Sequence, residues 1–446
     1  MKKYGDKTIS SEEWFGSIPS NWKTKRIKAL FDLHDERSYL PLSEVNLISL
    51  YSNIGVRQHA DIEHTTGNKA RNADGYKVVA PNDIIVNILL CWMGAIGCSA
   101  YNGVTSPAYD VYTPKEDINS QYYHYLFRLP AFSQQCYKVG KGIMSMRWRT
   151  YSPQFRNIMV PFPSRKEQDH IVRFLDWKVS GINKLIGIKQ KQISTLKEFM
   201  QTEIERQLYI YPITEAVRLK QLGTFFKGGA FSRDNLVENE EHPAILYGDI
   251  YTQYEYKTST ITHHIDGTAY SASRKISKGD IVMAGTGETK DEIGKSILYM
   301  GNQTVAVGGD VIVFHPNEGV NVEYLLYQLY SQAALKHRYV NAKGDIIVHI
   351  YPTTLGNTLI SWPGEDDQNR AVLRINEIIE QVNRTIGILK DEISTLKEYR
   401  VRLVADAVTG RIDVRNVEIP DYEYIEETDE MLEDSTDDME GELDEE

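Results

Sequence analysis

Apolar residues recur at every third or fourth position in two long segments of the chain, with polar residues between them. In the first segment the apolar positions are Ile171, Leu175, Val179, Ile182, Ile186, Ile193, Leu196, Met200 and Ile204. In the second they are Val372, Ile375, Ile379, Val382, Ile386, Leu389, Ile393, Leu396 and Leu403. This heptad spacing predicts two long helices, each with an apolar stripe that another helix covers.

The two helices are predicted to pair with each other. At 1.5 Å per residue each would be roughly 60 Å long, so neither could bury its stripe against a single compact domain. A globular segment connects the end of the first helix to the start of the second, which favours an antiparallel coiled coil. Glycine inside a helix costs about 1 kcal/mol relative to alanine. We hypothesise that Gly187 and Gly387 allow the helices to approach closely where they cross.

The chain repeats itself at an offset of 200 residues. The sequence ISTLKE occurs at 193–198 and again at 393–398, and Gln168 recurs as Gln368. A period this long exceeds the roughly 20 to 50 residues of solenoid repeats. Each copy is therefore predicted to be a whole domain followed by its helix, and two domains imply two similar sites.

The segments before the helices, at about residues 15–160 and 215–362, have the pattern of mixed domains. Each contains a turn followed by a β-branched strand, and at the repeat offset Asp110 aligns with Asp310. The predicted fold class is α+β: two similar globular domains joined by two long helices that form an antiparallel coiled coil.

The formal net charge of −12 comes from the end of the chain. No Lys or Arg follows Arg415, whereas 16 of the 62 acidic residues lie at 418–446. Without those 16, 46 acidic residues face 50 basic ones, a net charge near +4 that is compatible with a polyanionic partner. The acidic tail is predicted to be disordered. It is interpreted either as a solubility tail or as a DNA mimic that competes for the basic surface.

Neither membrane insertion nor a disulfide framework is predicted. No stretch approaches the ~18 uncharged apolar residues that span a bilayer. The N-terminus lacks the apolar core of a signal peptide, so we expect a cytoplasmic protein. Cys91, Cys98 and Cys136 have no CxxC spacing, which favours buried free thiols over a disulfide or a zinc site.

Several strings along the chain resemble those of the specificity subunit of type I restriction-modification systems. They are Ile18-Pro19-Ser20-Asn21-Trp22, Pro161-Phe162-Pro163, Glu167-Gln168-Asp169-His170, Gly344-Asp345-Ile346-Ile347 and Val408-Thr409-Gly410-Arg411-Ile412-Asp413. The resemblance covers residues from about 14 to 415. It departs from the family pattern at the second helix, which begins Asp367-Gln368 where Glu-Gln is usual. The first helix also ends without a copy of the Thr-Gly-Arg-Ile-Asp string.

The resemblance implies two target-recognition domains separated and joined by the two helices. The predicted parts are a first target-recognition domain with the N-terminal segment (1–162), a first helix (163–210), a second target-recognition domain (211–362), a second helix with the C-terminal string (363–415) and the acidic tail (416–446). Such a subunit has no catalytic activity and binds double-stranded DNA at a bipartite target with a fixed non-specific spacer.

The same resemblance implies the partners. Two methyltransferase subunits would modify adenine at N6, and motor-nuclease subunits would cleave DNA in an ATP-dependent reaction. S-adenosylmethionine, ATP and Mg²⁺ would belong to those partners, with no cofactor and no metal in this chain.

Side chains that can bond to base edges, with cations nearby to hold phosphates, are the candidates for contact with DNA. The densest group precedes each long helix. In the first domain the candidates are Arg71, Lys138, Lys141, Arg147, Trp148, Arg149 and Tyr151, with Lys77 in addition. In the second they are Lys227, Arg233, Arg274, Lys290, Lys343, His349 and Tyr351, with Arg338 and Tyr339 beside them. For each residue taken singly, a solvated surface position is the alternative.

Two other functions stay open at this point. Asp280, Glu288 and Lys290 have a spacing found in metal-dependent endonucleases, where two carboxylates hold Mg²⁺ and the lysine stabilises phosphate charge. The first domain has Asp83 but no counterpart of the other two, which argues against such a site. A protein-only adaptor built on the coiled coil is the third reading. Salt-dependent DNA binding by the assembled complex separates it from the DNA-binding function.

Overall fold

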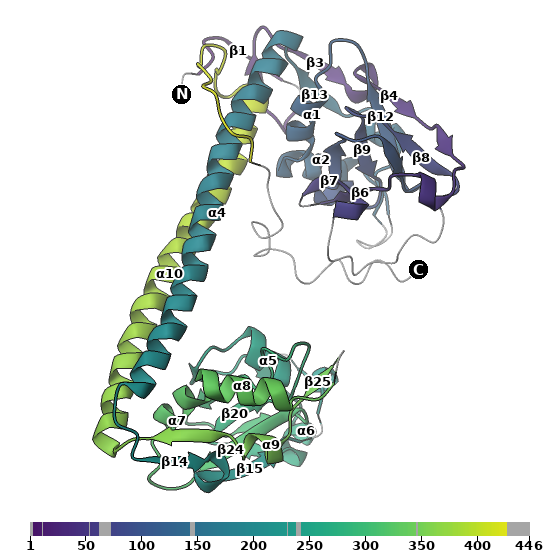
Figure 1. Ribbon diagram of the computed structural model, residues 1–446. Helices are drawn as coiled ribbons and strands as arrows, with labels where there is room; N and C mark the ends of the chain where they lie inside the picture. The colour runs from purple at the N-terminus through teal and green to yellow at the C-terminus, as the bar shows by residue number, and fades with distance from the viewer. Residues whose placement is uncertain are drawn as a thin grey trace. The chain divides into compact units, whose positions relative to one another are not determined.

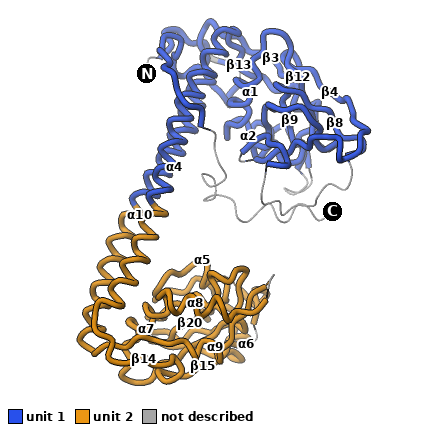
Figure 2. The backbone as a smooth tube through the Cα atoms, viewed as in Figure 1, with its two compact units in different colours: residues 1–192, 388–446 blue, residues 193–387 orange. Residues whose placement is uncertain are grey.

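The computed structural model describes residues 3–10, 12–52, 54–61, 73–142, 148–229, 231–237, 242–344 and 347–425. Its contacts divide the chain into unit 1, residues 1–192 with 388–446, and unit 2, residues 193–387 (Figure 2). Helix α4 (Arg165–Tyr209) and helix α10 (Glu365–Val408) each contribute to both units. Every unit thus combines one globular domain with segments of the two long helices.

The helices α4 and α10 run antiparallel. In unit 1, Lys189 of α4 forms an ion pair with Glu392 of α10, and Asn183 accepts a hydrogen bond from Arg400 at 2.9 Å. As the residue number rises along α4, the number of its partner falls along α10, so the chain directions are opposed (Figure 1). Ile186, in the predicted stripe, is fully buried. The predicted antiparallel coiled coil is confirmed.

Unit 1 is built on an antiparallel four-stranded sheet with a smaller sheet beside it. The main sheet contains, in spatial order, β10 (Ile96–Cys98), β9 (Ile84–Asn87), β12 (Tyr109–Pro114) and β4 (Phe31–His34). The smaller sheet contains β11 (Gly103–Thr105), β8 (Tyr76–Val79) and β5 (Arg37–Ser38). Three strand pairs complete it: β1 (Lys7–Ile9) with β2 (Ser17–Pro19), β3 (Lys23–Arg26) with β13 (Met159–Phe162), and β6 (Ile48–Tyr51) with β7 (Gly55–Gln58). Its short helices are α1 (Ser120–Phe127), α2 (Pro130–Val139) and α3 (Ser152–Phe155).

Unit 2 has the same central strand order with one strand added. Its main sheet contains β15 (Gly223–Lys227), β24 (Val311–Pro316), β20 (Ile281–Ala284), β22 (Ser296–Tyr299) and β17 (Lys257–Thr258). Its second sheet contains β18 (His263–His264), β16 (Pro243–Ile245), β23 (Val305–Val307) and β19 (Lys275–Ile276). Two strand pairs are β14 (Glu215–Arg218) with β26 (Leu359–Trp362) and β21 (Thr286–Gly287) with β25 (Val348–His349). Its short helices are α5 (Tyr247–Thr252), α6 (Gly267–Ala272), α7 (Val322–Leu329), α8 (Gln332–Asn341) and α9 (Pro352–Leu355).

Strand register sets the correspondence between the units and corrects one alignment. Strand β24 begins 202 positions after β12 and pairs with β20 in the register in which β12 pairs with β9. Asp310 therefore corresponds to Ala108, and the predicted alignment of Asp110 with Asp310 is wrong. Helix α9 begins only 200 positions after α3. Unit 2 is thus two residues shorter than unit 1 in the segment between α8 and α9.

The globular domain of unit 1 is attached to both long helices. The hydroxyl of Tyr122, on α1, donates to the carbonyl of Val408 at the end of α10 at 2.7 Å. Near the start of α4, the side chain of Gln168 accepts from the backbone N–H of Asn119 at 2.9 Å. Helix α1 is therefore bonded to the last turn of one long helix and to the first turn of the other.

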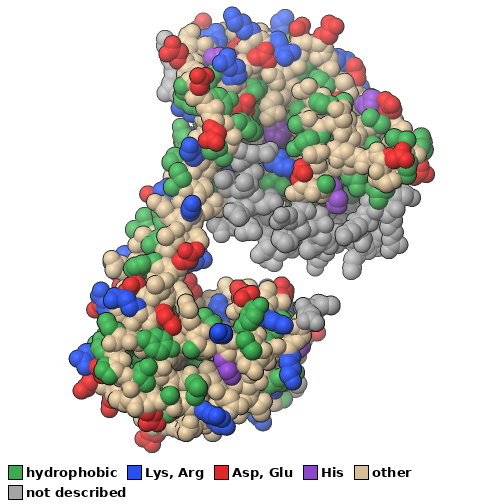
Figure 3. Space-filling model, in the orientation of Figure 1, with side chains coloured by type: hydrophobic (Ala, Val, Ile, Leu, Met, Phe, Trp, Pro, Cys, Tyr) green, Lys and Arg blue, Asp and Glu red, His purple; other side chains and the backbone are tan. Residues whose placement is uncertain are grey.

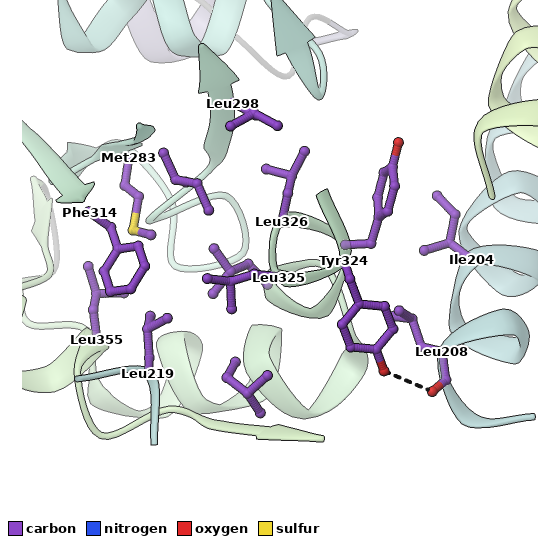
Figure 4. Packing of buried hydrophobic residues seen from close by; sticks show 14 of the residues in the cluster. Ile204, Leu208, Leu219, Met283, Leu298, Phe314, Tyr324, Leu325, Leu326 and Leu355 are labelled. Atoms are coloured by element: carbon purple, nitrogen blue, oxygen red, sulfur yellow. Dashed lines mark hydrogen bonds between the residues drawn. The ribbon is translucent and has the colours of Figure 1, made fainter. Parts of the chain in front are cut away.

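Unit 2 repeats this attachment. Tyr324, on α7, donates to the carbonyl of Leu208 near the end of α4 at 3.4 Å. Asn321, which caps α7, donates to Asn369 near the start of α10 at 2.9 Å. The leucines that follow Tyr324 are buried in one apolar cluster with Ile204 and Leu208 (Figure 4). Corresponding residues, Tyr122 and Tyr324 together with Asn119 and Asn321, thus join domain and helices in both units, with the roles of α4 and α10 exchanged.

Gly387 does not lie at a point of close approach, whereas Gly410 does. A Cβ added to Gly387 would meet no atom within 4 Å, so the close-approach hypothesis is wrong for this residue. Gly410, just after α10, has a φ of 68°, and a Cβ there would lie 2.3 Å from Pro19 Cδ. The N-terminal segment therefore packs directly on the end of α10.

The chain after α10 stays in contact with α4. The ring Nε2 of His170 lies 2.8 Å from the carbonyl oxygen of Val414. Further along, the backbone N–H of Ile425 donates to Ser180 Oγ at 3.2 Å, and the carbonyl of Ile425 accepts from Asn183 at 3.1 Å. Residues 426–446, which carry most of the predicted acidic tail, lie outside the described residues.

Two further features bear on the sequence predictions. The three cysteines are free thiols; Cys91 and Cys136 are buried, and Cys98 is partly buried. Among the residues that the structure describes, no helix combines the length and the apolarity needed to cross a membrane.

Replacing Tyr122 by phenylalanine tests the attachment of unit 1 to the end of α10. The variant Tyr122→Phe keeps the ring and removes the donor to Val408, and a buried acceptor left without a partner costs about 1–3 kcal/mol. We expect the free energy of unfolding, measured by urea denaturation, to fall by that amount. Tyr137→Phe is the matched control, because Tyr137 is 45% exposed. Equal losses in the two variants would contradict the attachment.

Candidate nucleic-acid interface

The cation-rich segments before the long helices form the same feature in both units. In unit 1, Lys141 and Arg149 exchange backbone hydrogen bonds of 2.9 and 3.0 Å. In unit 2, Lys343 and His349 exchange bonds of 2.9 and 2.7 Å. Each pair is an antiparallel bridge. We call the described residues at these bridges, 141–142 with 148–149 and 343–344 with 347–349, the cationic hairpins. The bridged residues are eight positions apart in unit 1 and six in unit 2, which accounts for the two-residue difference between the units.

Both cationic hairpins are fixed to the end of a main sheet. The backbone N–H of Thr150 donates to Ile88, the residue after β9, at 2.9 Å. The backbone N–H of Ile350 donates to Gly285, the residue after β20, at 3.0 Å. Because these bonds involve backbone atoms only, the attachment does not depend on the side chains that each hairpin carries.

Most of the predicted residues around the hairpins are accessible. The exposed ones are Lys138, Lys141, Arg149 and Tyr151 in unit 1, and Lys343 and Tyr351 in unit 2. His349 is partly buried, since its Nδ1 lies 3.1 Å from Thr286 Oγ1. Arg71 and Arg147 lie outside the described residues.

Trp148 holds the hairpin of unit 1 against α2. Its ring stacks on Tyr137 with centroids 4.7 Å apart, and its Nε1–H donates to the carbonyl of Tyr137 at 3.0 Å. A Cβ on Gly140 would lie 2.4 Å from that nitrogen, so the indole rests directly on the backbone of the turn. One ring face and the single donor of Trp148 are therefore engaged within unit 1.

Lys77 is not available to DNA. It is only 6% exposed, and its ammonium group lies 3.2 Å from Asp110 and 3.4 Å from Asp35. Asp110 also accepts from Tyr112 at 3.2 Å. Lys77 is engaged in ion pairs with two carboxylates beside the main sheet of unit 1, so its prediction as a DNA contact is wrong.

Arg338 is also withdrawn from the surface. It is 3% exposed and donates to the carbonyl of Gly294 at 2.9 Å, and burial lowers the pKa of its guanidinium. It therefore positions the loop after β21, which carries the partly exposed Lys290. The prediction that Arg338 contacts DNA is wrong, whereas its neighbour Tyr339 is 47% exposed.

Two predicted cations of unit 2 lie over aromatic rings. Lys227 Nζ is 5.6 Å from the ring centroid of Tyr351, and the Arg274 guanidinium is 5.7 Å from that of Phe226. Phe226 and Lys227 are neighbours in β15, so their side chains point to opposite faces of the strand. Lys227 is thus the one of these two cations that adjoins the hairpin.

Arg233 lies on the wall of a pocket of about 290 Å³ in unit 2. The pocket is also lined by Asp234, Tyr247 and Asp310. Tyr247 and Asp310 are not among the candidates predicted from the sequence. The signal that was available is the string Gly308-Gly309-Asp310, because glycines beside a strand mark close approach of a backbone or a ligand. Basic and acidic side chains are interspersed over the face of unit 2 in Figure 3, so a mixed-charge pocket is in keeping with its surroundings.

The duplicated framework has a match among protein families. Residues 19–198 and 214–398 each match the family model of the type I restriction modification DNA specificity domain. The chain belongs to this family. Its two globular domains are therefore DNA specificity domains, and the resemblance noted in the sequence is confirmed.

One solved structure shares the fold of this specificity protein, and a second aligns with it more weakly. A chain from a structure of complex assembly and conformational transition in a type I R-M system aligns with a TM-score of 0.64 and 15% identity, over 89% of this chain and 99% of that one. The HsdS subunit from Thermoanaerobacter tengcongensis aligns with a TM-score of 0.46 and 16% identity, over 89% and 98%. No curated protein matches the chain.

Both carboxylate oxygens of Asp280 have partners within the second specificity domain. Asp280 is 3% exposed; it accepts from the backbone of Ser277 at 2.8 Å and lies 2.6 Å from Nδ1 of His315. Asp83 accepts from Ala80 at 2.8 Å in the first domain, so both carboxylates cap the turn before the central strand. Within the described ranges, no group of three or more His, Cys, Asp or Glu side chains could hold a metal ion. The described residues thus give no support to an endonuclease site at Asp280.

Removing the two cations at the base of the first hairpin tests this surface. In Lys141→Ala with Arg149→Ala, each lost phosphate contact makes the slope of log K against log[salt] shallower by about 0.9. We therefore expect a slope shallower by up to about 1.8. DNA affinity of the chain in its assembled complex, titrated at several salt concentrations, gives that slope.

The control for this experiment removes the same charge elsewhere on unit 1. Arg26 and Lys28 are exposed and lie at the end of β3 and just after it. Arg26→Ala with Lys28→Ala is expected to leave the slope unchanged. If both double variants change the slope equally, net charge rather than the hairpin is responsible.

Proposed function

We propose that this chain reads a bipartite DNA target and directs partner subunits to it. Each unit reads one half-site, and α4 and α10 set the length of the non-specific gap. The observation that carries the proposal is the duplication of one framework with a cationic hairpin attached at the same place in each unit. Two specificity domains in one chain call for two stretches of DNA.

Recognition in each unit combines phosphate contact with base readout. Exposed cations such as Lys141 and Arg149 bind phosphates and fix the register of the domain, which by itself carries no sequence information. Polar side chains beside the hairpin bond to base edges in the major groove, where the four base pairs differ in donors and acceptors. Because the hairpins differ in length and sequence, the two half-sites have different sequences.

The gap follows from the length of the helices. Helix α4 has 45 residues and α10 has 44, so each is about 67 Å long at 1.5 Å per residue. Positions on one face of B-DNA recur about every 34 Å. A paired helix of this length therefore spans about two turns of DNA and holds the half-sites at a fixed separation.

The partners are two methyltransferase subunits and motor-nuclease subunits. Large apolar side chains are exposed along the long helices, at Leu185, Ile188, Phe199, Leu373, Ile388 and Tyr399. Contiguous exposed apolar patches mark protein interaction surfaces; we infer one on each helix, which suits two copies of one partner. The partners methylate adenine at N6 and cleave DNA, using S-adenosylmethionine, ATP and Mg²⁺. This chain contributes specificity without catalysis, in the cytoplasm with its DNA.

Deleting one heptad from each long helix tests the spacer. In each contact between α4 and α10, or between residues next to them, the two residue numbers add up to 581–584. Residues 190–196 therefore pair with residues 385–391. Their joint removal shortens the pair by about 10.5 Å and nearly preserves the direction of the apolar stripe. At 3.4 Å per base pair, we expect a gap shorter by at most about three base pairs and unchanged half-sites.

Methylation mapping in a host that expresses the chain with its methyltransferase subunit gives both gap and half-sites. Deleting 190–196 alone is the control, because it breaks the register of the pair; we expect it to abolish methylation. A double deletion that keeps the original gap, or that changes the half-site sequences, would show that the helices are not the spacer.

A further inference from the structure

A pocket in unit 2 is built from three separate segments of the chain, 231–234, 246–249 and 308–310. Its walls include the turn Gly308-Gly309-Asp310 between β23 and β24, the side chains of Arg233 and Asp234, and Tyr247 at the start of α5. Gly228, after β15, packs against this turn so closely that a Cβ would lie 2.0 Å from the Gly308 oxygen. The backbone of this turn is therefore close-packed against the end of β15.

The pocket adjoins the cationic hairpin of unit 2. The backbone N–H of Gly285 donates to the carbonyl of Asp310 at 2.8 Å, and the carbonyl of Gly285 accepts from Ile350 at 3.0 Å. One residue thus links the pocket turn to the hairpin base. In Figure 1, β25 lies on the side of unit 2 away from its long-helix segments, and α5 lies along the upper edge of the unit. A DNA duplex bound at the hairpin would meet the pocket as well.

Three polar groups of the pocket have no partner in the described part of the chain. They are the guanidinium of Arg233, the hydroxyl of Tyr247 and the carboxylate of Asp310, and all three residues are exposed. Asp249, on the same wall, differs: it is 4% exposed and accepts from the backbone of Leu246 at 2.8 Å. Asp249 is thus structural, whereas the other three present donors and an acceptor to a ligand.

The sign of the charges limits what that ligand can be. An exposed carboxylate next to a DNA-binding hairpin repels phosphate, so Asp310 is unfavourable there unless it accepts a hydrogen bond from a base. In the major groove cytosine offers its N4 amino group to Asp or Glu, and guanine offers O6 and N7 to the two-pronged donor of Arg. One guanine–cytosine pair presents both groups. The corresponding position in unit 1 is Ala108, so this chemistry belongs to unit 2 alone.

We infer that this pocket reads a guanine–cytosine pair in the half-site of unit 2. Arg233 donates to the guanine edge, Asp310 accepts from cytosine N4, and Tyr247 closes the wall beside them. This inference rests on the proposed function, since it assigns residues and a base pair to one of its two reading sites.

The test compares variants of the chain expressed with its methyltransferase subunit. Asp310→Asn keeps the shape and removes the charge of the acceptor, and Arg233→Lys keeps the charge and removes the planar fork that binds guanine. We expect each to relax one position of the unit 2 half-site, with discrimination there reduced by about 5- to 140-fold, the equivalent of 1–3 kcal/mol. The half-site of unit 1 stays unchanged. Glu318→Gln, an exposed acid outside the pocket, is the control and leaves both half-sites intact.

The outcomes separate this inference from the proposed function. If the parent chain yields a bipartite motif and Arg233→Lys and Asp310→Asn both yield the same motif, the pocket does not read a base. If Arg233→Lys retains full discrimination while Arg233→Ala weakens methylation at all sites equally, Arg233 binds phosphate and the inference is overturned. If the parent chain yields no bipartite motif, the proposed function itself fails. Loss of the unit 1 half-site in a variant would point to unfolding. In that case, binding of the purified complex to targets that differ by single base pairs decides whether the pocket reads a base.

Discussion

The ends of the two long helices, and the tyrosines that bond to them, are the constraint on which the rest of the structure depends. The last carbonyls of a helix have no partner within it, and Tyr122 supplies a donor to Val408 just as Tyr324 does to Leu208. In each case the domain bonds to the end of the helix that does not follow it in sequence. Unit 1 therefore needs residues beyond 388 to complete its core, and neither half of the chain is a self-contained copy.

On this shared framework the two units present different surfaces. The hairpins are attached by equivalent backbone bonds, yet the bridged residues are eight positions apart in one and six in the other. Near the start of β12, Asp110 is neutralised by the buried Lys77, whereas Asp310, just before β24, stays open in a pocket. Fixed attachment with variable side chains is what allows one fold to carry two specificities. The backbone bonds that hold the framework are thus separate from the side chains that differ between the two surfaces.

The sequence predicts the helices and their pairing well, because a heptad stripe over some 40 residues has few other ways to be buried. The sequence-based prediction fails where the tertiary structure determines whether a side chain is buried. Lys77 and Arg338 look like surface cations, but Lys77 is buried on the middle strand of the smaller sheet and Arg338 is buried on α8. The alignment of Asp110 with Asp310 is wrong because it assumes a constant offset of 200 residues between the units. The offset is 202 residues at β12 and β24 and returns to 200 only after the hairpin, where unit 2 is two residues shorter. The pocket around Arg233 is assembled from three separate segments, so no local pattern predicts it.

The central claim is that two unlike reading domains, held apart by paired helices, define one target. The most direct measurement is the complete map of adenine methylation in a host that expresses this chain with its methyltransferase subunit. The account predicts a single motif made of two different specified blocks separated by a gap of constant length and free sequence. One uninterrupted motif, two identical blocks, or a gap that varies from site to site would contradict it.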